Sequence, residues 1–178
     1  SKSVHFFDSQ TAELVKTIKV PGGGGNFTCL KDGSKCYVGL RKANAVGVID
    51  MAKLELMKTI ETGPDANRLY LNPGNSRYGL FANEAGKSDI VSIIDTQLDV
   101  KVKDIWTGLG PHNVAFDPDG KFAVISTKKE NVATLVDTGS ADPNDWDVIT
   151  TDLDSGIQNN GVRWVPSPAA LKKALAQN

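Results

Sequence analysis

The feature that most constrains the fold is an internal repeat. Four segments end in β-branched or other apolar residues followed by an aspartate, and these aspartates recur at intervals of 42, 45 and 42 residues. They are Asp8, Asp50, Asp95 and Asp137. A second pattern is in phase, because an asparagine stands seven residues before a turn glycine in Asn26–Gly33, Asn67–Gly74 and Asn113–Gly120. Two independent markers with one period indicate repeats of one structural unit.

Each repeat contains four short runs of alternating or β-branched residues, separated by Gly, Asn, Asp or Pro. Four strands in about 42 residues are the unit of a β-propeller blade, whereas helical and leucine-rich repeats have other periods. We therefore predict an all-β propeller with three complete four-stranded blades, at about residues 26–61, 67–106 and 113–153. Strands within 3–19 and at 161–165 predict partial blades at both ends.

The C-terminal segment has a different composition. Ser167 suits a helix N-cap, Pro168 suits the first helical position, and the following Ala, Leu and Lys residues favour helix. We expect a partial propeller over residues 1–166 and a short helical tail over 167–178.

The repeat resembles a known family. The segments "YVGL", "LFAN", "VGVID", "VSIID" and "GPHNVAFDPDGK" are similar to repeats of the YVTN family of bacterial β-propellers. The resemblance covers most of residues 3–168. It implies antiparallel four-stranded blades in an exported protein, which is periplasmic, extracellular or bound to the cell surface. It implies no activity, because this fold carries many. The blades are also similar to the propeller domains of haem d nitrite reductases and quinoprotein amine dehydrogenases.

Charge and hydropathy argue against a nucleic-acid partner and against a membrane span. Lys and Arg number 20 against 21 Asp and Glu, so the basic face expected of a nucleic-acid-binding protein is absent. No apolar run reaches the roughly 18 residues that span a bilayer. Because the chain begins with Ser1 and has no signal peptide, we interpret it as a processed or excised chain.

The number of blades predicts a partner. Natural closed propellers have about four to eight blades, and an open arc leaves strand edges and apolar faces uncovered. We therefore expect a protein partner that completes the propeller, either the remainder of a cleaved chain or a second copy of this one.

Ligands of propellers bind at the mouth of the central channel, which the loops leading into the innermost strands build. The candidate ligand-binding residues there are Arg68, His112, Asn113, Asn67 and Asn26. An imidazole beside a carboxamide can bind an anion, a haem propionate or a metal. The alternative is that these residues line the channel for structural reasons.

Two other repeated or glycine-rich features have structural interpretations. The repeated aspartates follow strands, where a carboxylate accepts backbone N–H bonds within a turn. The tetraglycine in "VPGGGGN" at 20–26 resembles a phosphate-binding loop, but no helix follows it and no Lys-Ser/Thr closes the motif. We expect a turn that makes a close approach at the channel.

The two cysteines, Cys29 and Cys36, lie on either side of "LKDGSK". A two-residue Asp32–Gly33 turn would place them face to face. A three-residue loop with a glycine bulge would place them on opposite faces of the hairpin. Alignment with the third repeat favours the second geometry, so we expect two buried free thiols.

Residues 137–154 form an acidic insertion with six aspartates and no Lys or Arg. Oxygen-rich loops of this kind can hold calcium, and a solvated acidic loop is the alternative. The candidate calcium ligands are Asp142, Asn144, Asp145 and Asp147. Trp146 lies among these charges and is a candidate anchor for a protein contact.

No catalytic set can be assembled from two histidines and the few glutamates. We expect a non-catalytic binding or scaffold module that acts through its channel mouth or its surfaces, without a cofactor. The alternative is part of a periplasmic redox enzyme whose propeller holds haem d or a quinone partner. The sequence has no CxxCH motif, which excludes covalent c-type haem in this chain.

Overall fold

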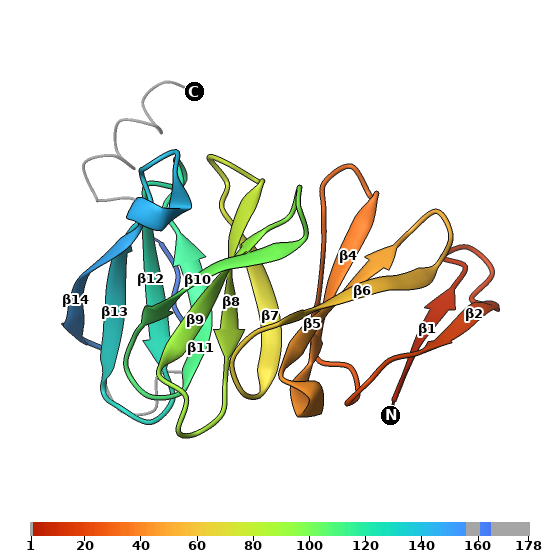
Figure 1. The fold of residues 1–178 in the computed structure, drawn as a ribbon, viewed down its shortest axis with the longest axis horizontal. Helices are drawn as coiled ribbons and strands as arrows, with labels where there is room; N and C mark the ends of the chain where they lie inside the picture. Colours follow the sequence, from red (N-terminus) through yellow and green to blue (C-terminus); the bar gives the residue numbers. More distant parts are fainter. Residues whose placement is uncertain (1, 156–160, 165–178) are drawn as a thin grey trace.

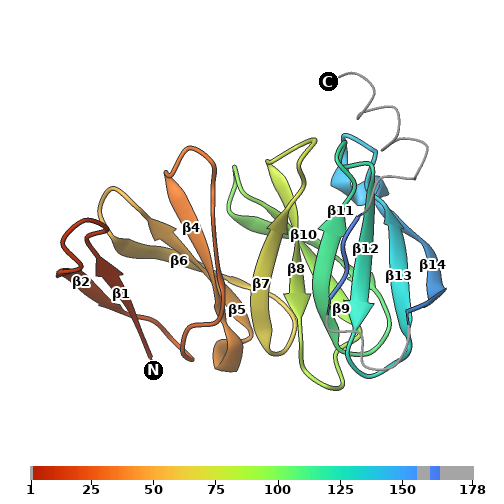
Figure 2. The same ribbon diagram turned by 180° about the vertical axis from the view of Figure 1, so that it is seen from behind.

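The computed structural model describes residues 2–155 and 161–164. They form one two-stranded sheet and three four-stranded antiparallel sheets, as the repeat predicts. The sheets lie side by side in sequence order, which Figure 1 shows from one side and Figure 2 from behind. Among these residues no helix is long and apolar enough to cross a membrane.

Every strand of a blade pairs with its neighbour in sequence. The half-blade consists of β1 (Ser3–Phe7) and β2 (Leu14–Lys19). The first blade consists of β3 (Phe27–Cys29), β4 (Lys35–Leu40), β5 (Ala45–Asp50) and β6 (Glu55–Glu61). The second consists of β7 (Ala66–Leu71), β8 (Tyr78–Asn83), β9 (Ile90–Asp95) and β10 (Val100–Trp106). The third consists of β11 (Pro111–Phe116), β12 (Phe122–Thr127), β13 (Val132–Asp137) and β14 (Asp147–Asp154). Two 3-10 turns, η1 (Arg41–Ala43) and η2 (Pro143–Asp145), lie between strands.

The repeated aspartates hold the turn between the two outer strands of each blade. Asp50 Oδ1 accepts hydrogen bonds from the amides of Ala52 and Lys53 at 2.9 and 3.0 Å. Asp95 Oδ1 accepts the equivalent hydrogen bonds from the amides of Gln97 and Leu98. Asp8 and Asp137 also accept bonds of this kind. The structural role predicted for these carboxylates is confirmed.

The hydrophobic core lies between blades, where the apolar faces of neighbouring sheets meet. Ile18 and Val38 are buried between the half-blade and the first blade. Tyr37 and Phe81 belong to the cluster between the first and second blades. The largest cluster joins the second and third blades, and its members include Leu80, Ile93, Ile125, Val136 and Trp146. Each blade is therefore stabilised by its neighbours, at about 1.5–3 kcal/mol for each large apolar side chain that is fully buried.

A buried polar contact also joins the first two blades. The Tyr37 hydroxyl donates a hydrogen bond to Asp99 Oδ1 at 2.6 Å, and Lys35 Nζ lies 2.8 Å from Asp99 Oδ2. Burial raises the pKa of Tyr37 above its ordinary value, and the neighbouring Asp99 raises it further. The hydroxyl therefore stays protonated and acts as the donor.

Trp146 is a core residue, so the prediction that it is an exposed contact anchor is wrong. Its side chain is 1% exposed. Its ring packs edge-on against Tyr78, with 6.0 Å between the ring centroids. Its Nε1 donates a hydrogen bond to the Ser140 carbonyl at 2.9 Å. The indole N–H thus has a partner within its own loop, and the acidic insertion folds back onto the core between the second and third blades.

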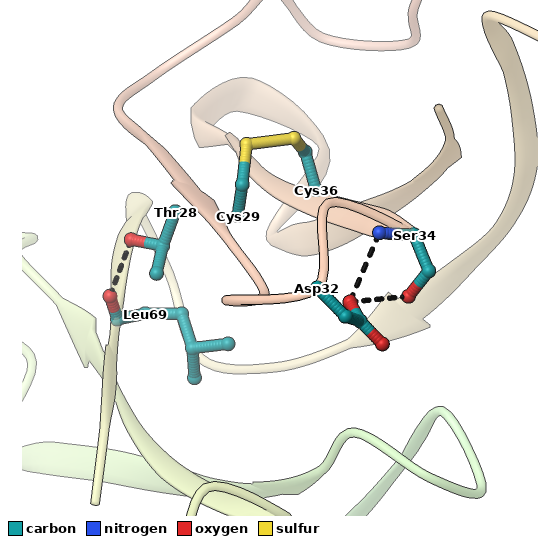
Figure 3. The surroundings of a disulfide bond; sticks show 6 residues. All are labelled: Thr28, Cys29, Asp32, Ser34, Cys36 and Leu69. Atoms are coloured by element: carbon teal, nitrogen blue, oxygen red, sulfur yellow. Dashed lines mark hydrogen bonds between the residues drawn. A yellow bond between two sulfur atoms is a disulfide. The ribbon is translucent and has the colours of Figure 1, made fainter. Parts of the chain in front are cut away.

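Cys29 and Cys36 form a disulfide, so the prediction of two free thiols is wrong (Figure 3). The two residues are direct neighbours on β3 and β4. The Leu30 amide donates to the Lys35 carbonyl at 2.9 Å, so the connecting loop consists of residues 31–34. A loop with an even number of residues keeps the flanking cysteines on one face. They also occupy a position without backbone hydrogen bonds, where cross-strand side chains lie closest.

The third blade has the same hairpin, which explains the error. Phe116 and Ala123, the residues aligned with the two cysteines, face each other directly in the register of β11 and β12. Gly33 and Gly120 both have positive φ, 71° and 70°, at equivalent positions of the two loops. The alignment of the repeats was therefore correct, and only the assumed loop length was wrong.

The elements predicted at the two ends of the propeller have different outcomes in the structure. Residues 161–164 form no strand, contrary to the prediction for 161–165, because no described strand pairs with them. The helix predicted over 167–178 lies outside the described residues. At the other end, β1 pairs with β2 alone among the described strands, so its second edge is unpaired.

Candidate functional site

Three charged residues occupy the same position in the three blades. Arg41, Glu84 and Lys128 each follow directly after the second strand of a blade. The innermost and second strands of a blade are antiparallel, so the end of the second strand lies beside the beginning of the innermost strand. These three residues therefore lie at the predicted channel mouth. The signs alternate, and the carboxylate of the middle blade stands between the two cations.

Glu84 is the centre of a cluster that joins all three blades. Its side chain is only 3% exposed, and its Oε2 lies 3.6 Å from Arg41 Nη1 and 3.2 Å from Lys128 Nζ. Its Oε1 lies 3.1 Å from His112 Nε2 and accepts a hydrogen bond from Asn67 Nδ2. We call these five residues the Glu84 cluster. A buried carboxylate with this many partners is fixed in place.

The neighbouring hydrogen bonds define the proton position on His112. The Tyr70 hydroxyl donates to Asn113 Oδ1 at 2.5 Å, which places Asn113 Nδ2 at 2.9 Å from His112 Nδ1. Because an amide nitrogen can only donate, Nδ1 accepts, and the neutral ring carries its proton on Nε2 facing Glu84. Burial raises the pKa of Tyr70, so its hydroxyl remains a donor. Both nitrogens of His112 are therefore engaged.

The other predicted mouth residues lie around this cluster. Asn26 Nδ2 donates to Asn67 Oδ1 at 2.9 Å, which links the first two innermost strands. Arg68 is exposed, and its guanidinium carbon lies 5.2 Å from the centre of the Tyr70 ring. The structure thus brings Asn26 together with Asn67 and His112 together with Asn113, whereas Arg68 contacts this group through Tyr70.

Sequence analysis missed Glu84, Arg41 and Lys128 as mouth residues. Their common feature is visible in the sequence, because each is the first residue after the second-strand segments "KCYVGL", "YGLFAN" and "FAVIST". A position that is charged in every repeat and alternates in sign was the indication that could have identified them.

A cavity of about 540 Å³ lies beside the innermost strands of the second and third blades. Its walls are Tyr70, Asn113, Val114 and residues 161–163. Arg163 supplies the cationic side chain among these lining residues. The cavity therefore combines apolar side chains with a carboxamide and a cation, next to the Glu84 cluster.

The four predicted calcium ligands mostly make local hydrogen bonds. Asp142 Oδ1 accepts from the Asn144 amide at 2.9 Å, and Asp145 Oδ2 accepts from the Ser140 hydroxyl at 3.0 Å. Asp147 accepts from the next amide in the chain. In the described part of the chain, no group of three or more His, Cys, Asp or Glu side chains is placed to hold a metal ion. Calcium binding by this loop stays a prediction.

The fold defines a class. No model of a protein family and no curated protein matches the chain. Solved structures match it, and the class that they and the three blades define is the β-propeller.

Two of these solved structures show the likeness. Hydrazine synthase from Kuenenia stuttgartiensis has a TM-score of 0.72 and 24% sequence identity, and the match covers 84% of this chain and 42% of that one. A putative 6-phosphogluconolactonase from Bacteroides fragilis has a TM-score of 0.67 and 20% identity, with 88% and 51% covered. The chain thus spans about half the length of these proteins or less. At these identities the likeness shows the fold alone.

Proposed function

We propose that this chain is a non-catalytic binding module of a YVTN-type β-propeller, which binds a small polar ligand at its channel mouth. The observation that carries the proposal is the 540 Å³ cavity beside β7 and β11. Ligand pockets have volumes of about 300–1,000 Å³ and combine apolar walls with a few placed polar groups. This cavity has that composition.

The mouth residues have distinct roles in this proposal. Arg163 lines the cavity and supplies a cationic group for the ligand, and Asn113 supplies its carboxamide edge. Arg68 flanks this group through the Tyr70 ring. The Glu84 cluster holds Asn113 and His112 in place, with Asn26 and Asn67 behind them. Because both ring nitrogens of His112 and both oxygens of Glu84 have protein partners, the cluster supports binding rather than proton transfer.

The disulfide supports an exported location. Disulfides persist in oxidising compartments and are rare in the cytosol of most organisms. The Cys29–Cys36 bond is therefore consistent with a protein that is periplasmic, extracellular or bound to the cell surface. Free thiols at these positions in freshly isolated protein would count against this location.

We further propose that a protein partner completes the half-blade. The second edge of β1 carries no strand among the described residues, and Phe27 on the facing innermost strand is 43% exposed. Two strands from a second copy, or from the remainder of a cleaved chain, would pair with this edge and cover Phe27.

A titration monitored by NMR tests the ligand proposal. Gluconate is a suitable probe, because it is the phosphate-free relative of the compound in the name of one structural neighbour. We expect saturable shift changes at the Asn113 side chain and at the Val114 and Val162 amides, and about tenfold weaker binding for Arg163→Ala. Lys58→Ala, at an exposed position of β6, is the control.

Two outcomes would overturn the proposal. The absence of saturable changes at these groups would show that the mouth does not bind this class of ligand. A purified chain that keeps visible absorbance after dialysis would instead favour the alternative, a section of a periplasmic redox enzyme that holds haem d or a quinone partner.

A further inference from the structure

A second pocket at the same end of the propeller has a different chemistry. It has a volume of about 430 Å³ and lies between the loop before β3 and the turn after β4. We call it the glycine pocket, and its lining residues are Lys2, Gly22, Gly23, Gly24, Arg41, Lys42 and Asp65. Three of these side chains are cationic and one is anionic.

Arg41 is held rigidly at the wall of this pocket. Its Nε and Nη2 donate to the two carboxylate oxygens of Asp65 at 2.7 and 2.6 Å. Asp65 is in turn positioned by Asn44, whose Oδ1 accepts a hydrogen bond from the Asp65 amide at 3.2 Å. A bidentate pair fixes the plane of the guanidinium group. The geometry of the cation is thus set before any ligand arrives.

The charge of Arg41 is compensated by Asp65, whereas two lysines remain unpaired. Lys2 and Lys42 are exposed, and neither forms an ion pair within residues 2–155 and 161–164. The pocket therefore carries a net positive charge that no described carboxylate neutralises.

The glycines shape the pocket because a side chain at Gly22 has no room. A Cβ atom there would lie 2.4 Å from the Ala43 backbone nitrogen, and φ is +71° at Gly22 and +85° at Gly23. Within the described residues, the amides of Gly22, Gly23 and Gly24 donate no hydrogen bond to the protein. Backbone amides without a protein acceptor, beside cationic side chains, are a favourable environment for an anion.

We propose that the glycine pocket binds the phosphate group of a small phosphorylated ligand. Lysine ammonium groups and backbone amides supply hydrogen-bond donors and positive charge to phosphate oxygens. The volume exceeds that of a lone phosphate and leaves room for the attached group. The inference extends the proposed function, because Arg41 belongs both to this pocket and to the Glu84 cluster.

The test is an NMR titration of the full chain at constant ionic strength, with inorganic phosphate and then glucose 6-phosphate as probes. We expect saturable shifts of the amides of residues 22–24 and 42, and tighter binding of glucose 6-phosphate. Lys42→Glu should weaken binding at least about tenfold. Lys58→Glu makes the same charge change on exposed β6 and should leave the affinity unchanged.

A second variant tests the pocket itself. Gly24 has no positive φ, and a Cβ atom there meets only Val38 Cγ2 at 3.8 Å, so Gly24→Asp should fold normally. Its carboxylate would lie in the pocket, and we expect loss of phosphate binding with an unchanged thermal midpoint.

The outcomes distinguish this inference from the proposed function. Non-saturating shifts that both lysine variants reduce equally would mean screening of surface charge and would overturn the phosphate site. Equal affinity for the two probes would overturn the assignment to a phosphorylated ligand. If phosphate shifts the glycine amides but gluconate shifts no signal of Asn113, phosphate binding in the glycine pocket would be supported and the proposed ligand site at the channel mouth would be overturned. If gluconate shifts Asn113 but phosphate shifts none of the glycine amides, only the proposed phosphate site in the glycine pocket would be overturned.

Discussion

Glu84 Oε1 lies 3.1 Å from His112 Nε2 across the boundary between the second and third blades. The same carboxylate contacts Arg41 of the first blade, so a single side chain joins three sheets. Because it is 3% exposed, water does little to replace these contacts if one partner is removed. Its loss should therefore affect the stability of the whole array.

Replacing Glu84 by Ala should lower the free energy of unfolding by about 2 kcal/mol, because the buried Asn67 amide and the His112 ring lose their acceptor. Urea denaturation measures the change. Glu55→Ala is the control, since the Glu55 side chain is 62% exposed and its ion pair with Lys16 spans 3.4 Å. An exposed pair of this kind contributes about 0.5 kcal/mol. Similar losses for both variants would show that the Glu84 cluster is not a joint between blades.

Replacing Trp146 by Ala should cost about 3–5 kcal/mol, because it leaves a large cavity against Tyr78. Trp106 is 68% exposed, so Trp106→Ala should change stability by less than about 0.5 kcal/mol. Thermal denaturation compares the two variants. A small effect at Trp146 would mean that the acidic insertion does not contribute to the core.

Reducing the Cys29–Cys36 bond should lower stability by about 2 kcal/mol, because the closed loop is short. The oxidised chain should also be lighter by two hydrogens in a mass spectrum. A Cys29→Ser/Cys36→Ala double variant controls for direct effects of the reductant, and its stability should not respond to dithiothreitol. A wild-type mass that reduction leaves unchanged would contradict the disulfide.

Acid should weaken the turn at Asp95. Burial alone would raise the pKa of Asp95, but Arg77 and the amides of Leu98 and Gln97 lower it below its ordinary value. A lowered folded-state pKa contributes stability above the unfolded value, and this contribution is lost as pH falls through the folded one. Between about pH 5 and 2 the wild type should therefore lose more stability than Asp95→Asn. Parallel pH profiles for the two proteins would contradict this assignment.

The unpaired edge of β1 should make the chain associate. Phe7 on β1 and Phe27 on β3, the innermost strand of the first blade, are 61% and 43% exposed. Sedimentation at micromolar concentration should show a dimer or a complex with the partner. Phe7→Lys and Phe27→Lys should shift the chain toward the monomer, whereas Met57→Lys on the outer strand of the first blade should not. A well-folded wild-type monomer would refute the expected partner.

The strands could be predicted from the sequence because their limits are set locally. Asp50 and Asp95 form their turns with amides two and three residues ahead, so the same short pattern ends each third strand. The pairing of the cysteines was not predictable in this way. It depends on whether the loop before Cys36 has an odd or an even number of residues. A change of one residue in the loop moves the side chains of the following strand to the opposite face of the hairpin.

The Glu84 cluster was predicted in part. The segments that carry Asn67, His112 and Asn113 were identified because they lie at the beginning of the innermost strands β7 and β11. The role of Glu84 was missed because it depends on contacts with residues 43 and 44 positions away in the sequence, which only the packing of neighbouring blades brings close. Trp146 was misplaced for the same reason, since acidic neighbours in the sequence concealed its burial.

The alternation of Arg41, Glu84 and Lys128 gives each blade a fixed place in the order. If the middle blade were deleted, Arg41 and Lys128 would become neighbours and repel each other without a carboxylate between them. If the middle blade were duplicated, two buried glutamates would face each other. The repeats therefore share a backbone but are not interchangeable modules. The difference in charge at this one position therefore disfavours chains in which a blade has been gained or lost.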